Sequence, residues 1–364
     1  MESLVDGLRA AINFVCEPKL YITLMAAWCT ISVFKPEWWV SPRRFALIFG
    51  GFILLYCFSI TDHNFQLIAF KGDNVPIIFM LFLLVFFTWL AFYRGHQNDL
   101  RWAAGKKLIE EEDGEVKVLV WPHLLYIEFI VGVFVTALLL LWSIGIQAPL
   151  EEPASAARTP NPSKAPWYFL GLQEMLVYFD PWMAGVVAPS LIVVGLMALP
   201  YLDRNPKGNG YYTLKERRFA IYGFCFGFLV LWIALILLGT AFRGPNWNFF
   251  GPFDFWDPHK QPVLNNINLS EIIYLQILGR ALPTHWFARE IFGIVAVLFY
   301  VLALPPLLLK TKFFNKLSVD LGAPRYYTFM FLFLMMMSLP IKMVLRWTLN
   351  LKYLVYIPDY FLNI

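Results

Sequence analysis

The stretch "WPHLLYIEFIVGVFVTALLLLWSIGI" at residues 121–146 decides the fold class of this chain. Apart from His123 and Glu128 near its start, it is almost entirely apolar. A helix needs roughly 20 apolar residues to cross about 30 Å of hydrocarbon, and this run is long enough to do so. It therefore predicts a helix that spans a membrane.

Seven further apolar runs are bounded by charged residues or proline. They lie at 20–34, 45–61, 75–93, 182–202, 218–242, 286–309 and 326–346. The first is the weakest, because it is short and contains threonine and serine. The 364 residues are 59% hydrophobic, 18% aromatic and 15% charged, which excludes an ordinary water-soluble domain. The predicted fold class is all-α: a polytopic transmembrane bundle of about eight membrane-spanning helices with a proline-rich outer loop.

Lysine and arginine are concentrated in four short loops, which hold 17 of the 29 basic residues. These loops are 35–44, 94–117, 203–218 and 310–325. Short loops rich in Lys and Arg stay on the cytoplasmic side, so both ends of the chain are expected outside. The net charge of +4 then reflects membrane topology, and the lack of one basic patch argues against a nucleic-acid partner.

Three segments between the spans have distinctive compositions. The outer loop at about 147–181 is rich in proline, alanine and serine, which predicts an irregular, proline-stiffened segment. The segment 242–262 reads "FRGPNWNFFGPFDFWDPHKQP". It fits two alternatives, an interfacial aromatic belt or a contact with a partner protein. The stretch 265–282 is short and amphipathic, which favours a helix on the membrane surface.

The cysteines give no sign of a metal site or of covalently bound haem. They are Cys16, Cys29, Cys57 and Cys225. Their spacing is unpaired, and the C-x-x-C-H haem-attachment motif is missing. We therefore expect packed, inert thiols.

From about residue 118 the order of motifs is specific. A helix opens with "WPHLLYIEF", the proline-rich loop ends in "APWYFLGLQEML", a later helix ends in "MALPYLDRNP", and another closes with "FRGPNW". Over about 118–250 this order resembles the C-terminal half of cytochrome b. In particular, it resembles subunit IV of complexes in which cytochrome b is split into two chains, within the quinol:cytochrome c oxidoreductase family.

With this resemblance the chain divides into four parts. Residues 1–100 form an N-terminal three-helix membrane extension with no assigned role, and 101–117 form a charged cytoplasmic linker. Residues 118–250 are the core that is similar to subunit IV. Residues 251–364 hold a surface segment and two C-terminal transmembrane helices.

In the family, a Pro-Glu-Trp-Tyr motif in the outer loop helps to form the quinol-oxidation site. Trp167 and Tyr168 align with its last two residues, whereas Ala165 and Pro166 stand where the family has Pro and Glu. That glutamate accepts a proton from quinol in the family's usual mechanism. Its absence here leaves the chain in need of another proton acceptor.

Glu174 is the candidate replacement. It lies six residues after Tyr168, beside Gln173, with no basic residue within four positions. A carboxylate in such apolar surroundings is costly to keep ionised, as suits a proton acceptor. Pro166, Trp167, Tyr168 and Gln173 would line the quinol pocket. The alternative is that Glu174 caps or hydrogen-bonds within the loop, or pairs with a partner chain.

Two residues near the start of 121–146 are candidates for the inner side of the membrane. His123 stands where the family's "WPNDLLYIF" has Asp, a residue that the resemblance links to proton uptake near the quinone-reduction site. Histidine also relays protons near neutral pH, although an interfacial histidine without a special role is equally open. Glu128 is an acid inside a membrane helix, which is a candidate for function or for pairing with Arg or Lys of another subunit.

Haem is expected on another chain. The family's two b-type haems are held by paired histidines of the N-terminal half of cytochrome b. The histidines here are His63, His96, His123, His259 and His285, and their spacing does not suit stacked haems. The resemblance implies a haem-bearing cytochrome b chain, a Rieske-type iron–sulfur protein and cytochrome c subunits as partners, with quinol or quinone at the site of this chain.

The predicted function is that of a haem-free, multi-pass subunit of a cytochrome bc-type complex in a bacterial inner membrane, with a dimeric complex expected. It would form part of the quinol-oxidation site and support electron transfer to a cytochrome c-like acceptor with proton translocation. The altered motif favours menaquinol. The alternative is a structural membrane anchor without a quinone site. A transporter is disfavoured, because the sequence shows no internal repeat and no broken helix with midplane charges.

Overall fold

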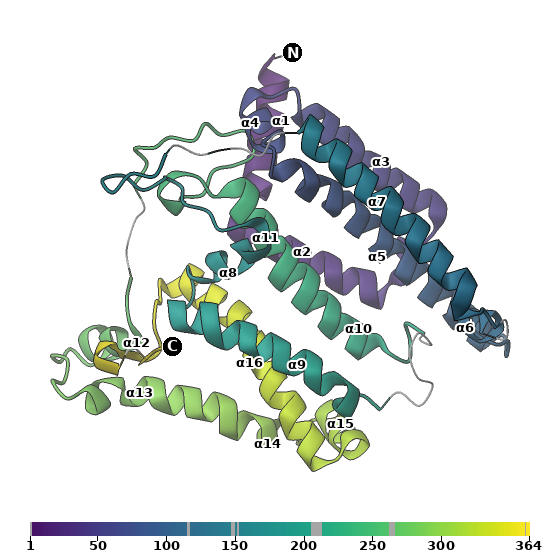
Figure 1. Cartoon of the computed structure of the whole chain (residues 1–364). Coiled ribbons are helices and arrows are strands. Elements are labelled where there is room, and N and C mark those ends of the chain that lie inside the picture. Colours follow the sequence, from purple (N-terminus) through teal and green to yellow (C-terminus); the bar gives the residue numbers. More distant parts are fainter. Residues whose placement is uncertain are drawn as a thin grey trace. The chain divides into compact units, whose positions relative to one another are not determined.

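The computed structural model describes residues 2–114, 117–146, 150, 153–204, 213–261, 266–360 and 362–364 (Figure 1). These residues are helical except for loops and one short strand pair. In that pair β1 (Tyr356–Ile357) runs antiparallel to β2 (Leu362–Asn363). Parts of the 147–181 and 203–218 loops lie outside the described residues.

The chain forms two compact units, each described by itself. The first contains the described residues of 1–163, 207–226 and 240–259. Its helices are α1 (Glu2–Val15), α2 (Pro18–Phe34), α3 (Pro42–Ser59), α4 (His63–Ala69), α5 (Asn74–Ala103), α6 (Ile109–Asp113), α7 (Leu125–Gly145) and α10 (Arg218–Cys225). Single turns at Pro36–Trp38 and Pro245–Trp247 and a wide turn at Val120–Leu124 complete it.

The second unit contains the described residues of 164–206, 227–239 and 260–364. Its helices are α8 (Leu170–Met175), α9 (Ala188–Leu202), α11 (Ala234–Leu237), α12 (Leu269–Glu271), α13 (Trp286–Leu298), α14 (Leu304–Leu308), α15 (Lys312–Leu321) and α16 (Ala323–Leu349). Tight turns stand at Trp167–Phe169 and Pro358–Tyr360. Wider helical turns at Met183–Val187, Ile272–Ile277 and Phe299–Ala303 extend α9, α12 and α13, and those at Phe226–Ile233 and Leu238–Phe242 flank α11.

Within the described residues, seven helices are long and apolar enough to cross a membrane. They are Pro42–Ser59, Asn74–Ala103, Val120–Gly145, Met183–Leu202, Arg218–Phe242, Trp286–Leu308 and Ala323–Leu349. Each contains or closely overlaps a predicted span, so the all-α polytopic fold class is confirmed. The remaining predicted span, at 20–34, corresponds to α2, a shorter apolar helix of 17 residues.

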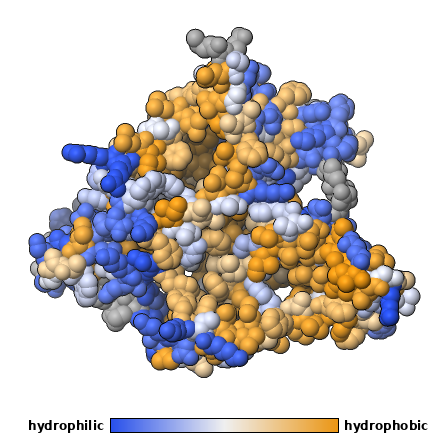
Figure 2. Space-filling model, turned by 180° about the vertical axis from the view of Figure 1, so that it is seen from behind, coloured by the Kyte–Doolittle hydropathy of each residue, from blue (hydrophilic) through white to orange (hydrophobic). Residues whose placement is uncertain are grey.

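Exposed apolar side chains cover much of the molecule. Figure 2 shows broad hydrophobic areas on one face, with hydrophilic residues gathered in separate patches. The helices that qualify as membrane spans bury between 0% and 44% of their most apolar window inside the chain. In water this surface would be unfavourable, whereas lipid or partner helices can cover it.

Local sequence explains where several helices begin and end. Proline stands in the first turn of α2, α3 and α16, where its fixed φ suits a helix and its missing N–H costs nothing. The predicted surface helix in 265–282 begins at the capping residue Asn268 and runs through α12 to Ile277. It is shorter than the amphipathic stretch, because Gly279 adopts a left-handed φ of 61° and ends it.

The described start of the charged segment, residues 101–114, folds back onto the end of α5. The buried Asn98 donates to Glu110 Oε2 at 2.7 Å and accepts from the N–H of Ile109 at 3.1 Å. Leu108 is fully buried beside them. Part of the expected linker is therefore packed structure within the first unit.

The second unit has its core where α16 meets the turn between α13 and α14. Tyr326, Met330 and Leu334 are buried there. Tyr326 donates to the carbonyl of Pro305 at 2.9 Å, and Tyr300 to the carbonyl of Leu334 at 2.7 Å. In Figure 1, α9 lies along α16 in this unit, and the two helices are in contact.

Candidate functional site

The aromatic motif of the outer loop forms a single tight turn. The N–H of Phe169 donates to the carbonyl of Pro166 at 2.8 Å, and α8 begins at the next residue. Trp167 and Tyr168 meet edge to face, with 5.7 Å between their ring centres. Their side chains are 37% and 49% exposed, so both rings offer surface to a ligand or a partner.

Gln173 holds the chain just before the motif. Its side-chain oxygen accepts a hydrogen bond from the N–H of Ala165 at 2.8 Å. This contact closes the loop around Pro166 and fixes where the aromatic turn begins. Gln173 was predicted to line a quinol pocket, and its amide oxygen holds the loop that leads into the aromatic turn.

Glu174 is fully buried in α8, with 0% of its surface exposed. Two glycines let α8 lie close to the helix around α11. A Cβ on Gly171 would stand 3.4 Å from Ile236 Cγ1, and one on Gly239 would stand 3.3 Å from the carbonyl oxygen of Leu170. This close approach leaves the Glu174 side chain enclosed by protein. Glu174 lies in the short helix that directly follows the turn with Trp167 and Tyr168.

The C-terminal tail packs against the segment that follows α8. Lys352 donates from Nζ to the carbonyl of Leu176 at 3.2 Å. Tyr353 donates to Asp180 Oδ1 at 3.2 Å, and Asn363 donates to the same oxygen at 3.4 Å. These contacts could not be predicted from the sequence, because no local pattern links position 353 to a loop more than 170 residues earlier.

Lys342 is a buried cation in the same region, with 2% of its surface exposed. Its Nζ donates to the carbonyl of Lys352 at 2.6 Å. It also lies 5.7 Å from the ring centre of Phe179 and 6.0 Å from that of Tyr353. A lysine inside the apolar run 326–346 is a signal that the sequence did offer, because ionisable residues in membrane helices are rarely without a role.

Burial and neighbouring charges shift the pKa values of two side chains of the tail, Tyr353 and Lys352. Burial, followed by the charge of the Asp180 carboxylate and its hydrogen bond, raises the pKa of Tyr353 to about 12. Burial and the nearby Arg346 lower the pKa of Lys352, and Asp180 offsets part of that effect. The tail therefore keeps Tyr353 as a neutral hydrogen-bond donor at physiological pH.

The inner-side candidates lie in the first unit. His123 stands in the wide turn before α7, and Glu128 stands in the first turn of α7. Both side chains are exposed, and the most apolar window of this span contains no buried residue. The two residues are five positions apart on a helix, so they point to different faces.

Of the five histidines, His285 has a defined structural contact. Its Nδ1 accepts from the N–H of Phe287 at 3.3 Å and caps α13. The part of the chain that the structure describes holds no group of three His, Cys, Asp or Glu residues that could bind a metal ion.

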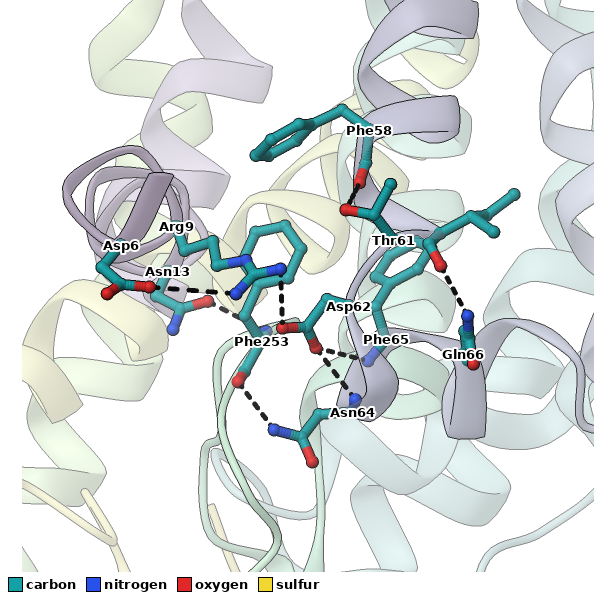
Figure 3. A network of polar contacts seen from close by, with 11 residues as sticks. Asp6, Arg9, Asn13, Phe58, Thr61, Asp62, Asn64, Phe65, Gln66 and Phe253 are labelled. Atoms are coloured by element: carbon teal, nitrogen blue, oxygen red, sulfur yellow. Dashed lines mark hydrogen bonds and ion pairs between the residues drawn. The ribbon is translucent and has the colours of Figure 1, made fainter. Parts of the chain in front are cut away.

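The aromatic segment 242–262 is fastened to the N-terminal helices within the first unit (Figure 3). Asn13 donates to Asp254 Oδ1 at 2.6 Å and accepts from the N–H of Phe253 at 3.1 Å. Asn64 donates to the carbonyl of Phe253 at 3.1 Å, and the Arg9 guanidinium lies 6.0 Å from its ring centre. This part of the segment thus packs against the chain's own extension.

A pair of asparagines joins the same segment to the proline-rich loop. Asn161 donates to Asn246 Oδ1 at 3.0 Å, and the N–H of Asn246 donates to Asn161 Oδ1 at 2.7 Å. Asn246 adopts a left-handed φ of 57°, which asparagine tolerates better than most residues. The proline-rich loop is therefore held on the first unit six residues before Trp167.

A comparison with protein families addresses the same part of the chain. Residues 153–251 match the family model described as cytochrome b (C-terminal)/b6/petD. A curated relative, the menaquinol:cytochrome c reductase cytochrome c subunit of Geobacillus thermodenitrificans, is 34% identical over 103 residues. The match covers 27% of this chain and 40% of that protein, so the chain spans less than half of the relative's length. No solved structure matches the chain.

The matched range contains the aromatic turn, α8 with Glu174, and the asparagine pair. Residues 153–251 therefore match the cytochrome b C-terminal family, and these findings fit the resemblance of the chain to subunit IV of complexes in which cytochrome b is split.

Proposed function

We propose that this chain is a membrane subunit of a menaquinol:cytochrome c oxidoreductase and forms part of its quinol-oxidation site. The observation that carries the proposal is the fully buried Glu174, placed in α8 directly after the exposed Trp167–Tyr168 turn. The turn lies in the range that matches the cytochrome b C-terminal family. The name of the Geobacillus relative supports menaquinol as the substrate class.

In this mechanism Trp167 and Tyr168 supply an apolar wall for the quinol ring. Gln173 holds the loop in place through the Ala165 N–H. The carboxylate of Glu174 accepts a proton from the quinol hydroxyl as the electrons leave for the acceptor chains. A carboxylate beside the bound ring is the class of group that accepts protons in general base catalysis.

The electron carriers belong to partner chains. We assign the b-type haems to a chain equivalent to the N-terminal half of cytochrome b, and we assign the iron–sulfur cluster and c-type haem to a Rieske-type protein and a cytochrome c subunit. The α7 surface supports a partner within the membrane, because Glu128 is exposed in a span that buries no residue of its most apolar window. A carboxyl group that faced acyl chains would be unfavourable, so we place a partner helix over it.

At the inner side, His123 and Glu128 would serve proton uptake near a quinone-reduction site. The basic loops support a topology in which both ends of the chain lie outside a bacterial inner membrane. Cysteine labelling of intact cells tests this topology: a probe at Ser155 should react from outside, and a probe at Ser318 should not. The reverse pattern would overturn the orientation and the outer position of Trp167.

The proposal predicts what purifies with the chain. A tagged copy isolated from its native membranes should carry b- and c-type haem spectra and reduce cytochrome c with a soluble menaquinol analogue. The same chain expressed alone should yield no pyridine haemochrome signal. Near one haem per isolated chain would contradict the assignment of haem to a partner.

A further inference from the structure

The turn between α14 and α15 and the first turns of α15 carry three lysines around a hollow. The hollow has a volume of about 330 Å³ and is lined by Lys310, Thr311, Lys312, Asn315 and Lys316. All three lysines are exposed. None of their ammonium groups forms an ion pair with a carboxylate of the described residues. The hollow therefore concentrates positive charge that no carboxylate of the described residues neutralises.

Local packing holds these lysines in place. Thr311 donates from its hydroxyl to the carbonyl of Leu308 at 2.8 Å, and Asn315 donates to the carbonyl of Leu309 at 3.2 Å. Phe314 packs against the buried cluster around Tyr326. The backbone that carries the lysines is thus ordered before any ligand arrives, which lowers the entropy lost on binding.

The surrounding segment adds to the positive charge. Residues 310–325 contain four basic residues, and Asp320 is the single acidic residue among them. Arg204 donates to the backbone carbonyl of Asp320, which brings a fifth cation to α15. Because the structure describes this segment without gaps, the excess of cations is a property of the folded turn.

The hollow lies where the chain enters and leaves the membrane. Just before it the span Trp286–Leu308 ends, and the span Ala323–Leu349 begins just after α15. On α15 the apolar residues Phe313 and Val319 are 49% and 75% exposed. A short helix with exposed apolar residues beside lysines fits the headgroup region of a bilayer.

We propose that this hollow binds the phosphate headgroup of an anionic phospholipid. Lysine ammonium groups attract phosphate as compact charges, and basic pockets beside transmembrane helices suit such headgroups. A lipid also brings acyl chains to the level of Phe313, whereas inorganic phosphate does not. The basic loop 310–325 belongs to the cytoplasmic side, so the lipid would come from that leaflet. The inference does not depend on the quinol site.

Native mass spectrometry of the purified full chain in a neutral detergent tests the proposal. The titrants are phosphatidylglycerol, phosphatidylcholine and inorganic phosphate. The test variant combines Lys310→Gln, Lys312→Gln and Lys316→Gln. The matched control combines Lys35→Gln, Lys106→Gln and Lys215→Gln, which removes the same charge from three separate basic loops and breaks no side-chain bond that the structure shows.

The parent should bind phosphatidylglycerol saturably and more tightly than either other titrant. Each lysine near a membrane surface contributes roughly a five-fold factor to affinity. The affinity of the variant that lacks the three clustered lysines for phosphatidylglycerol should therefore fall at least about ten-fold. The dispersed control should stay within about two-fold of the parent. An equal loss of phosphatidylglycerol affinity in the clustered variant and the dispersed control would overturn the site. Equal affinity of the parent for phosphatidylglycerol and phosphatidylcholine would also overturn it. Equal affinity for inorganic phosphate would overturn the lipid assignment.

Two further measurements keep the test decisive if the clustered variant folds poorly. A variant with arginine at the same three positions should keep phosphatidylglycerol binding, because the charge is retained. Binding to the parent should weaken as salt concentration rises, because salt screens the ammonium groups. Salt-independent binding would contradict an electrostatic headgroup site.

Discussion

Tyr353 donates its phenol hydrogen to Asp180 Oδ1 at 3.2 Å, and so joins the C-terminal tail to the segment that follows α8. Lys352 makes a second link, to the carbonyl of Leu176. The tail packs against the residues directly after the helix that carries Glu174. The tail therefore contacts the segment next to the proposed quinol site.

Tyr353→Phe removes this bond, and its effect should depend on pH. The pKa of Tyr353 is raised to about 12, so the stability gained from its protonated form is complete below about pH 10. That stability is lost as pH rises from about 10 to about 12. The difference in unfolding temperature between the parent and Tyr353→Phe should therefore shrink over this interval.

Tyrosinate absorbance provides the direct measurement. Up to about pH 11 the folded parent and Tyr353→Phe should show the same tyrosinate signal, because Tyr353 stays protonated. If the parent instead shows one additional tyrosinate with a midpoint near its ordinary value of about 10, the Tyr353–Asp180 contact does not exist in solution.

Gly293→Ala should detach the tail from α13. A Cβ at Gly293 would overlap the carbonyl oxygen of Leu354 and stand 3.0 Å from Val355 Cγ2. Overpacking of this kind costs about 1–3 kcal/mol of stability, because the contact is with backbone that cannot rotate away. Tryptophan fluorescence during thermal unfolding in detergent measures the loss.

Gly132→Ala in α7 is the matched control, since no atom lies within 4 Å of the place that its Cβ would take. Alanine is favoured over glycine inside a helix by up to about 1 kcal/mol, so the control should keep or raise stability. Similar destabilisation by both changes would argue that the tail does not pack on Gly293.

Asp62 has two separable roles in the network of Figure 3. Its Oδ1 accepts from the N–H groups of Asn64 and Phe65 and caps α4, and its Oδ2 lies 3.4 Å from Arg9. Asp62→Ala removes both roles and should cost about 1–2 kcal/mol. Asp62→Asn keeps an acceptor for the cap and should cost less than about 1 kcal/mol, because the ion pair is partly exposed. Equal losses would show that the ion pair, and not the cap, holds this turn.

The sequence predicted the architecture well, because membrane spans follow from length and hydrophobicity alone. The run at 121–146 is recovered as the span Val120–Gly145. The span predicted at 75–93 continues to Ala103 in the structure. That extension depends on tertiary contacts of Asn98 and Asp99, which hydropathy does not register.

The candidate site was predicted in part. The family motif predicted the aromatic turn, and Glu174 was identified as the one acidic residue in the apolar stretch after it. These residues are neighbours along the chain. The support from Tyr353 and Asn363 depends on folding that joins distant residues, and no local pattern marks it. The contact between Gln173 and the Ala165 N–H was equally invisible, because a glutamine in an apolar segment fits either a ligand contact or a backbone contact.

The central claim is that Glu174 takes a proton during quinol oxidation. The most direct measurement is the steady-state menaquinol:cytochrome c activity, with its pH profile, of the intact complex carrying Glu174→Gln, with Glu37→Gln at an exposed carboxylate outside the proposed sites as the control. Assistance by a general base is typically worth about 10²- to 10⁴-fold in rate, so Glu174→Gln should slow turnover within that range at unchanged haem content and assembly. Near-parental turnover with an unshifted pH profile would contradict the account and return Glu174 to a structural role.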